Sequence, residues 1–216
     1  MPIDQTLLAT LKTKSPDQQN VIKYMVLPHT GCGEKSAWTD TDFDMHVNTA
    51  LKTQSGEQMA IDALGIDIDD CKEIEPIHFW GYKMADAYCL RRVDGSIVSS
   101  RIQDTWLFFS DEQMFIYSKD IWLDEDKKAE TADEYFYKDV TNVSIKSTEE
   151  KPKSLVTASS GGCSQPENVI QSQTLTSDKF IVVVPGASLD LALYNKSEIN
   201  AQIQAVRAKL REKKRG

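Results

Sequence analysis

A glycine-rich segment near the N-terminus is the first place where residue types and spacing could do chemistry. Residues 31–36 read Gly-Cys-Gly-Glu-Lys-Ser, and a glycine-rich loop followed by Lys and Ser can cradle a phosphate with its backbone N–H groups. Here Glu34 occupies the position that needs a glycine, and a predicted helix and Pro28 precede the segment where the motif needs a strand. The sequence therefore favours a plain loop between helices over a nucleotide site.

Asp40, Asp42 and Asp44 alternate in the way that the first ligands of a calcium-binding loop do. Such a loop also needs a glycine at its sixth position and a bidentate glutamate at its twelfth, and this chain has Met45 and Leu51 there. The loop could therefore neither turn sharply nor close on the ion. We expect these acids to lie at the start of a helix, where the helix dipole favours negative charge.

The histidines and cysteines form no catalytic or metal-binding motif. The sequence contains no His-Glu-x-x-His, no Gly-x-Ser-x-Gly and no Cys-x-x-Cys. A catalytic or zinc site assembled from residues far apart in the chain stays open, but we expect free thiols, no metal, no cofactor and no catalysis. The residues concerned are His29, His46, His78, Cys32, Cys71, Cys89 and Cys163.

The first third of the chain predicts helices. Ser15 followed by Pro16 is typical of an N-cap and a first helical position, and apolar residues continue that helix to Met25, before Pro28. Gly65 is typical of the residue just after a helix. The predicted helices are a short one around residues 7–11, one from 16 to about 25, one from about 39 or 41 to 54, and one from 57 to 64.

From about residue 74 the pattern changes from helical to extended. Asp94-Gly95 predicts a hairpin turn, and the polar residues 110–113 separate two aromatic runs that predict a second hairpin. The predicted strands lie at residues 77–82, 87–90, 96–102, 105–109, 114–117, 135–140, 142–145, 180–184 and 189–193.

Two segments complete the chain. Residues 146–171, rich in Ser, Thr and Gly, predict a loop with a short strand at Val169-Ile170, and the role of its central part, residues 150–167, is left open. After a predicted cap at Ser197, residues 198–214 predict an amphipathic helix that covers a sheet. Its apolar stripe consists of Ile199, Ile203, Val206 and Leu210.

The charge distribution limits the partners. The chain has 216 residues and a formal net charge of −8, and 27% of its residues are charged. Such an acidic body disfavours nucleic acid and leaves at most weak association with anionic membranes, because both attract clustered Lys and Arg. With no signal-peptide pattern and no apolar run of about 20 residues, we expect a cytoplasmic protein. Exposed strand edges allow a homodimer.

Antiparallel strands followed by one C-terminal helix resemble the pleckstrin-homology (PH) superfold. Residues 105–117, Thr-Trp-Leu-Phe-Phe-Ser-Asp-Glu-Gln-Met-Phe-Ile-Tyr, and residues 135–144, Tyr-Phe-Tyr-Lys-Asp-Val-Thr-Asn-Val-Ser, are similar to bacterial PH-like domains. The resemblance covers about residues 75–214 and implies a PH-like β-barrel or sandwich closed by the last helix. Together with the helical segment that the sequence pattern predicts for residues 1–70, it gives an α+β fold. It implies little about activity, since this scaffold hosts lipid, peptide and protein binding.

The resemblance and the aromatic residues suggest two sets of site residues. Lipid-binding members of the wider family hold inositol phosphates with a Lys and Arg pairs on the first strands, and Lys83, Arg91 and Arg92 occupy comparable positions here. However, the usual Arg-x-Arg alternation is missing. The second set, which fills a core or lines a ligand pocket, consists of Trp80, Tyr82, Trp106 and Phe108.

These observations favour a non-catalytic interaction module. It would recognise a protein or peptide through an exposed sheet edge or through the groove between the last strand and the last helix. The alternative is a small-ligand-binding protein or enzyme with an aromatic-lined pocket, or a weak binder of anionic lipid.

Overall fold

Among the described residues, helices come first along the chain, ten strands follow, and one helix comes last. The computed structural model describes residues 11–27, 36–72, 74–158 and 174–213. Its helices are α2 (Pro16–Val26), α3 (Asp40–Gln54), α4 (Glu57–Leu64), the 3-10 turn η1 (Ile68–Asp70) and α5 (Lys196–Lys213). Its strands are β1 (Ile74–Tyr82), β2 (Tyr88–Arg91), β3 (Ile97–Ser99), β4 (Arg101–Phe109), β5 (Gln113–Trp122), β6 (Lys128–Phe136), β7 (Asn142–Glu150), β8 (Ser154–Thr157), β9 (Leu175–Val184) and β10 (Ala187–Leu193).

The early helices begin and end where the sequence predicts. Ser15 caps α2 through a reciprocal pair of bonds with Gln18, and Thr39 caps α3 in the same way with Asp42, so the first backbone N–H groups of both helices find acceptors. Gly65 ends α4 in a left-handed conformation with φ 64°, which costs a glycine little because it has no Cβ.

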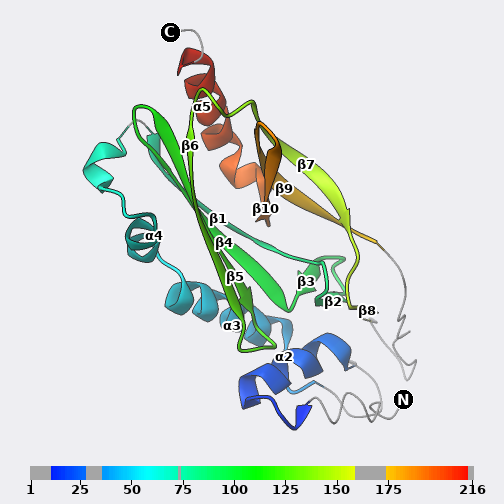
Figure 1. The fold of residues 1–216 in the computed structure, drawn as a ribbon. Coiled ribbons are helices and arrows are strands. Elements are labelled where there is room, and N and C mark those ends of the chain that lie inside the picture. Colours follow the sequence, from blue (N-terminus) through cyan, green and yellow to red (C-terminus); the bar gives the residue numbers. More distant parts are fainter. Residues whose placement is uncertain (1–10, 28–35, 73, 159–173, 214–216) are drawn as a thin grey trace.

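The central element is an antiparallel sheet with the strand order β1-β4-β5-β6 (Figure 1). Because side chains alternate across a strand, this sheet has two different faces. The inner face is largely apolar and packs against the second sheet. The outer face is covered in part by α3 and α4.

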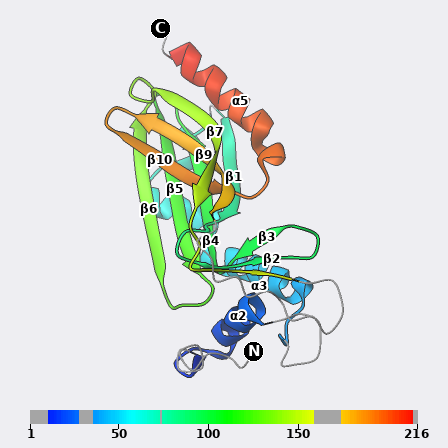
Figure 2. The ribbon, with the colours of Figure 1, turned by 90° about the vertical axis from the view of Figure 1, so that its right-hand side faces the viewer.

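The second sheet is also antiparallel, with the order β10-β9-β7, and α5 lies against it and against β1 (Figure 2). The predicted apolar stripe of α5 is buried here, with exposed fractions of 6% or less, so the prediction is confirmed. The core between these elements is contributed by the inner face, the β6–β7 connection, the second sheet and α5: Ile77, Phe79, Leu107, Phe109, Met114, Ile116, Tyr137, Val140, Val143, Phe180, Val182, Leu191, Leu193, Ile199, Ile203, Val206 and Leu210.

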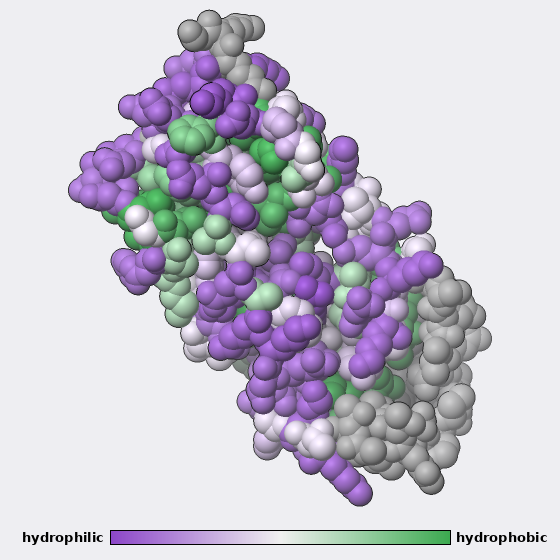
Figure 3. Space-filling model, in the orientation of Figure 1, coloured by the Kyte–Doolittle hydropathy of each residue, from purple (hydrophilic) through white to green (hydrophobic). Residues whose placement is uncertain are grey.

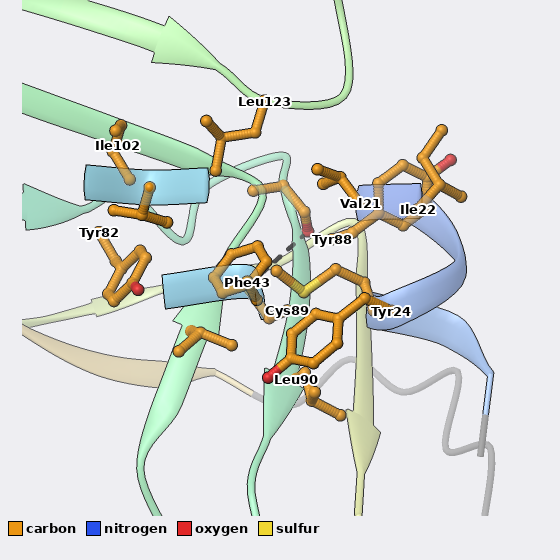
Figure 4. Packing of buried hydrophobic residues seen from close by; sticks show 14 of the residues in the cluster. Val21, Ile22, Tyr24, Phe43, Tyr82, Tyr88, Cys89, Leu90, Ile102 and Leu123 are labelled. Carbon is orange, nitrogen blue, oxygen red and sulfur yellow. Dashed lines mark hydrogen bonds between the residues drawn. The ribbon is translucent and has the colours of Figure 1, made fainter. Parts of the chain in front are cut away.

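A third, small sheet has the order β3-β2-β8, and β2 and β8 run parallel. It shares a second core with α2 and α3, in which Phe43 stacks on Tyr24 with ring centroids 4.6 Å apart (Figure 4). This core joins helices before residue 70 to strands after it, so the two parts of the chain pack against each other. The division into a segment 1–70 and a domain 75–214 stays a prediction.

A third cluster lies where α4 covers the outer face, around the buried Ala60, Phe108 and Tyr117. Hydrophilic residues dominate the face drawn in Figure 3, and the apolar residues that show there lie mainly in its upper half. Met59 and Phe136, from α4 and β6, are more than two-fifths exposed. The cover that α4 provides is therefore incomplete.

Three predictions need correction. Residues 146–158 are not a loop, because β7 continues to Glu150 and β8 follows. The predicted strand at 135–140 starts earlier, at Lys128, and ends at Phe136. The predicted cap at Ser197 is replaced by one at Asn195. The Asn195 side-chain oxygen accepts a hydrogen bond from the Ser197 backbone N–H at 3.1 Å, in the first turn of α5.

Several predictions lie outside the described residues. These are most of the helix around residues 7–11, nearly all of the glycine-rich segment, and the strand at Val169-Ile170. The described strands confirm the α+β class, the antiparallel sheets and the C-terminal helix, but they form separate sheets and no closed barrel. No described helix has the length and apolarity that crossing a membrane requires.

Candidate functional site

A buried carboxylate on the outer face organises the best candidate site. Asp104, in β4, is 1% exposed, and its Oδ1 accepts a hydrogen bond from His78 Nε2–H at 2.7 Å. Its other oxygen, Oδ2, accepts from the Ser55 hydroxyl, which follows α3. The junction of α3 and α4 thus lies over this carboxylate, and the imidazole of His78 is fixed in orientation.

The imidazole also belongs to a stack of rings. Because His78 and Trp106 are directly opposite each other in the β1–β4 pair, their rings lie on the same face, with centroids 4.3 Å apart and an interplanar angle of 21°. Phe108 continues the stack beyond Trp106, with centroids 6.2 Å apart.

A second ring stack lies on the same face, two residues further along β1. Trp80 stacks on Tyr194 with centroids 4.7 Å apart and an interplanar angle of 15°, and Tyr82 meets both rings edge-on. Tyr194 follows β10, and its backbone N–H donates to the Trp80 carbonyl at 2.8 Å. The end of β10 is thereby held against β1.

We call Tyr194, Trp80, His78 and Trp106 the ring strip. Tyr194 is 53% exposed and the His78 side chain 41%, whereas Trp80 and Trp106 are half-buried. The indole Nε1 of Trp106 is buried without an acceptor among the described residues. The exposed parts of the strip are therefore mainly the phenol ring of Tyr194 and the imidazole of His78.

The order of the polar groups is not that of a catalytic triad. In a triad the histidine lies between the serine and the aspartate, so that it can take the serine proton. Here the Ser55 hydroxyl donates directly to Asp104, and His78 contacts the same carboxylate from another side. The arrangement orients an imidazole but does not activate a serine.

A second polar group borders the site. Lys119 Nζ, on β5, lies 2.5 Å from Glu130 Oε1 on β6, and the hydrogen bond from Lys119 lowers the pKa of Glu130. Burial, together with Glu130, raises the pKa of Tyr117 to about 12. The tyrosine is therefore neutral at physiological pH, and no charge is left unpaired between Lys119 and Glu130.

The four aromatic residues predicted to line a pocket all lie on the outer face, but in two clusters. Trp80 and Tyr82 pack toward α2 and α3, and Trp106 and Phe108 pack toward α4. Tyr82 and Phe108 are 6% and 0% exposed, so they fill cores, whereas the two tryptophans are half-buried. A ligand pocket formed by the four remains a prediction.

Sequence reasoning missed His78 and Asp104 as a pair, and Tyr194 altogether. Two signals were available: His78 and Trp80 share a strand face at spacing two, and Asp104 is an acid just before the apolar run at residues 106–109. An acid in such a place needs a hydrogen-bonding partner once it is buried.

The predicted anion-binding residues have separate surroundings. Lys83 Nζ lies 2.9 Å from Asp120 Oδ2. Arg92 is 9% exposed, and its NH2 lies 2.7 Å from Asp44 Oδ1. Arg91 is half-buried at the end of β2. Two of the three cations are thus already paired with carboxylates, which weighs against a shared anion site.

The acids of the calcium-loop pattern have structural partners, and the described cysteines belong to no metal-binding group. Asp40 Oδ1 accepts from the Tyr24 hydroxyl at 2.7 Å, Asp42 caps α3, and Asp44 pairs with Arg92. Among the described residues, no group of three or more His, Cys, Asp or Glu side chains is placed to hold a metal ion. Cys71 and Cys89 are buried free thiols; Cys32, Cys163 and His29 lie outside the described residues.

No protein-family model, curated protein or solved structure matches this chain.

Proposed function

We propose that this chain is a non-catalytic recognition module and that its ring strip binds a protein or peptide partner. The observation behind the proposal is the pair of ring stacks on one sheet face, of which Tyr194 and His78 are the most exposed members. Exposed Trp and Tyr side chains provide much of the binding free energy at protein interfaces, because they bury a large area with few rotatable bonds.

The rigidity of the strip supports recognition. His78 is fixed by Asp104, and Trp80 is fixed by its stack with Tyr194 and by the backbone bond between these two residues. Side chains that are already ordered lose little conformational entropy on binding. A partner could therefore lay apolar or proline side chains on the rings and hydrogen-bond to Nδ1 of His78, the ring nitrogen that does not contact Asp104.

The scaffold proposal is a PH-like fold. Its support is the order of seven strands in the four-stranded and three-stranded antiparallel sheets, followed by α5. The hairpin β2–β3 and the strand β8 would be additions to that plan. PH-like scaffolds host several kinds of ligand, so the argument for a protein or peptide partner comes from the ring strip.

The test is selection of a random-peptide display library on the full chain, followed by fluorescence anisotropy of the enriched peptides. We expect Tyr194→Ala to weaken binding by about tenfold or more, because it removes an exposed ring and frees Trp80. Tyr194→Phe, which keeps the ring, should bind nearly as well as the wild type. Phe136→Ala is the matched control: Phe136 is 42% exposed but lies on β6, at the opposite edge of the sheet.

Enriched peptides that bind Tyr194→Ala as tightly as the wild type would contradict the proposed surface. If no peptide is enriched and a small molecule instead quenches Trp80 fluorescence at stoichiometric concentration, the small-ligand alternative replaces the proposal.

A further inference from the structure

β6 is an exposed strand at the edge of the central sheet opposite β1. β6 pairs with β5 along nine residues and is the last strand of its sheet. Seven of its residues are exposed and two are half-buried, and Figure 2 shows the strand at the outer margin of the molecule. In contrast, other edges are partly occupied: Tyr194 donates to the β1 carbonyl of Trp80, and Arg207 Nε donates to the Val143 carbonyl of β7 at 3.0 Å.

The register shows which backbone groups of β6 point outward. Just beyond its two ends, Trp122 N–H donates to the Lys127 carbonyl and Tyr137 N–H donates to the Glu112 carbonyl. In an antiparallel pair the hydrogen-bonded positions alternate, so the odd-numbered residues of β6 bond to β5. The N–H and C=O groups of the even-numbered residues therefore point away from the sheet, and no described strand pairs with them.

The side chains of this edge are mainly acidic. Glu130, Asp133 and Glu134 lie on β6, with Lys128 as its one base. Glu130 is partly neutralised by Lys119, whereas Asp133 has no ion-pair partner among the described residues. In a full-length antiparallel pair of β6 with a second copy of itself, centred on Ala132, Glu130 would face Glu134 twice. Facing like charges are unfavourable, so the edge is better suited to a basic strand than to its own copy.

We propose that an extended basic segment of a partner protein adds to β6 as a fifth strand of the central sheet. Its backbone would bond to the outward groups of Glu130, Ala132 and Glu134. Lys or Arg residues four positions apart on the partner would face the two glutamates. Main-chain bonds give such strand addition its affinity, and cross-strand charge pairs select the sequence. This surface is separate from the ring strip, and the proposal does not depend on the proposed function.

The test uses the full chain and two fluorescein-labelled peptides of about ten residues that alternate Val with Lys or Val with Glu. We expect the Lys peptide to bind, the Glu peptide to bind at least about tenfold more weakly, and the difference to shrink at high salt. Ala132→Pro removes one outward N–H at an exposed edge position, where proline is tolerated, and should lower affinity for the Lys peptide by about tenfold. Ala132→Val, which keeps that N–H, is the matched control.

Three results would overturn the proposal: equal binding of the Lys and Glu peptides, full binding by Ala132→Pro, or no binding by the wild type. Sedimentation velocity adds a fourth. A concentration-dependent dimer that Ala132→Pro abolishes would assign the edge to a second copy of this chain. Circular dichroism of both variants checks that loss of binding is not loss of folding.

Discussion

Arg92 is a buried arginine whose side chain connects two helices to the small sheet. Its guanidinium donates to the Tyr24 hydroxyl at 2.8 Å and to Asp44, and it also bonds to the backbone carbonyl of Asp40. These three partners come from α2 and α3, whereas Arg92 follows β2. The side chain therefore fastens the helices to the small sheet.

We predict that Arg92→Ala lowers the free energy of unfolding by about 2–3 kcal/mol, because the Tyr24 hydroxyl loses a buried partner and Asp44 its counter-ion. Urea unfolding followed by tryptophan fluorescence measures the change. Arg91→Ala, at the neighbouring half-buried position, is the control and should cost less than about 1 kcal/mol. If Arg91→Ala instead abolished sedimentation with anionic liposomes at unchanged stability, the predicted anion site would gain support.

Asp124 is a carboxyl group whose charged form is destabilised by burial in the folded state. It is 5% exposed, its Oδ1 has no hydrogen-bond partner among the described residues, and burial raises its pKa. A folded-state pKa above the unfolded value means that the folded state binds the proton more tightly. Stability is therefore lost as the pH rises from below the unfolded pKa to above the folded one.

Asp124→Asn keeps the shape of the side chain and removes the charge. We predict that it raises the free energy of unfolding by about 1 kcal/mol near neutral pH, because a neutral amide is cheaper to bury than a carboxylate. The gain should shrink at an acidic pH of about 3, below the ordinary pKa of an aspartate, because the pKa of Asp124 is raised and its wild-type carboxyl is protonated there. Urea titrations of both proteins at the two pH values measure it, and a variant less stable than the wild type at neutral pH would contradict the argument.

At the scale of elements, β1 and β10 approach each other closely at Gly81. A Cβ on Gly81 would lie 2.4 Å from the Leu193 backbone N and 2.5 Å from the Ala192 carbonyl carbon. The same approach lets the Gln103 side-chain oxygen accept from the Ala192 N–H at 2.7 Å. Position 81 of β1 therefore requires glycine, because the backbone of β10 leaves no room for a Cβ there.

We predict that Gly81→Ala lowers the free energy of unfolding by about 3 kcal/mol or more, because backbone atoms of β10 would have to move. Thermal unfolding followed by circular dichroism measures the loss. Gly56→Ala is the control: its φ is 178° and no atom lies within 4 Å of the added Cβ, so its effect should stay within about 1 kcal/mol. Similar losses in the two variants would show that space at Gly81 is not the cause.

Sequence patterns predicted the elements whose signals are local. The cap at Ser15, the glycine after α4 and the stripe of α5 depend on neighbours within a few residues, and the structure has each of them. The sequence did not predict the first part of β6, because residues 128–132 show no apolar alternation and contain only one β-branched residue, Thr131. Its position is determined by pairing with β5, which a sequence window does not contain.

At the scale of the whole molecule, the candidate site depends on contacts between distant segments. His78 meets Asp104 and Trp106 through the register of β1 and β4, and Tyr194 reaches Trp80 because β10 approaches β1. The sequence predicted three of these strands and an aromatic site on their residues, but no local pattern states which residues face one another. Of the candidate site, the sequence suggested Trp80 and Trp106, whereas the His78–Asp104 pair and the Trp80–Tyr194 stack depend on contacts between distant segments.

The parallel pairing of β2 with β8 has a consequence for the order in which the chain folds. Cys89 pairs with Leu155, and β3 to β7 lie between the two strands in the sequence. The two strands can therefore meet only after a long stretch of chain has been gathered, and such non-local contacts form slowly because the entropy of closing a loop is lost first. Since β8 contributes Leu155 and Val156 to the core of α2 and α3, we expect the N-terminal helices to gain their final packing late, after the central hairpins have assembled.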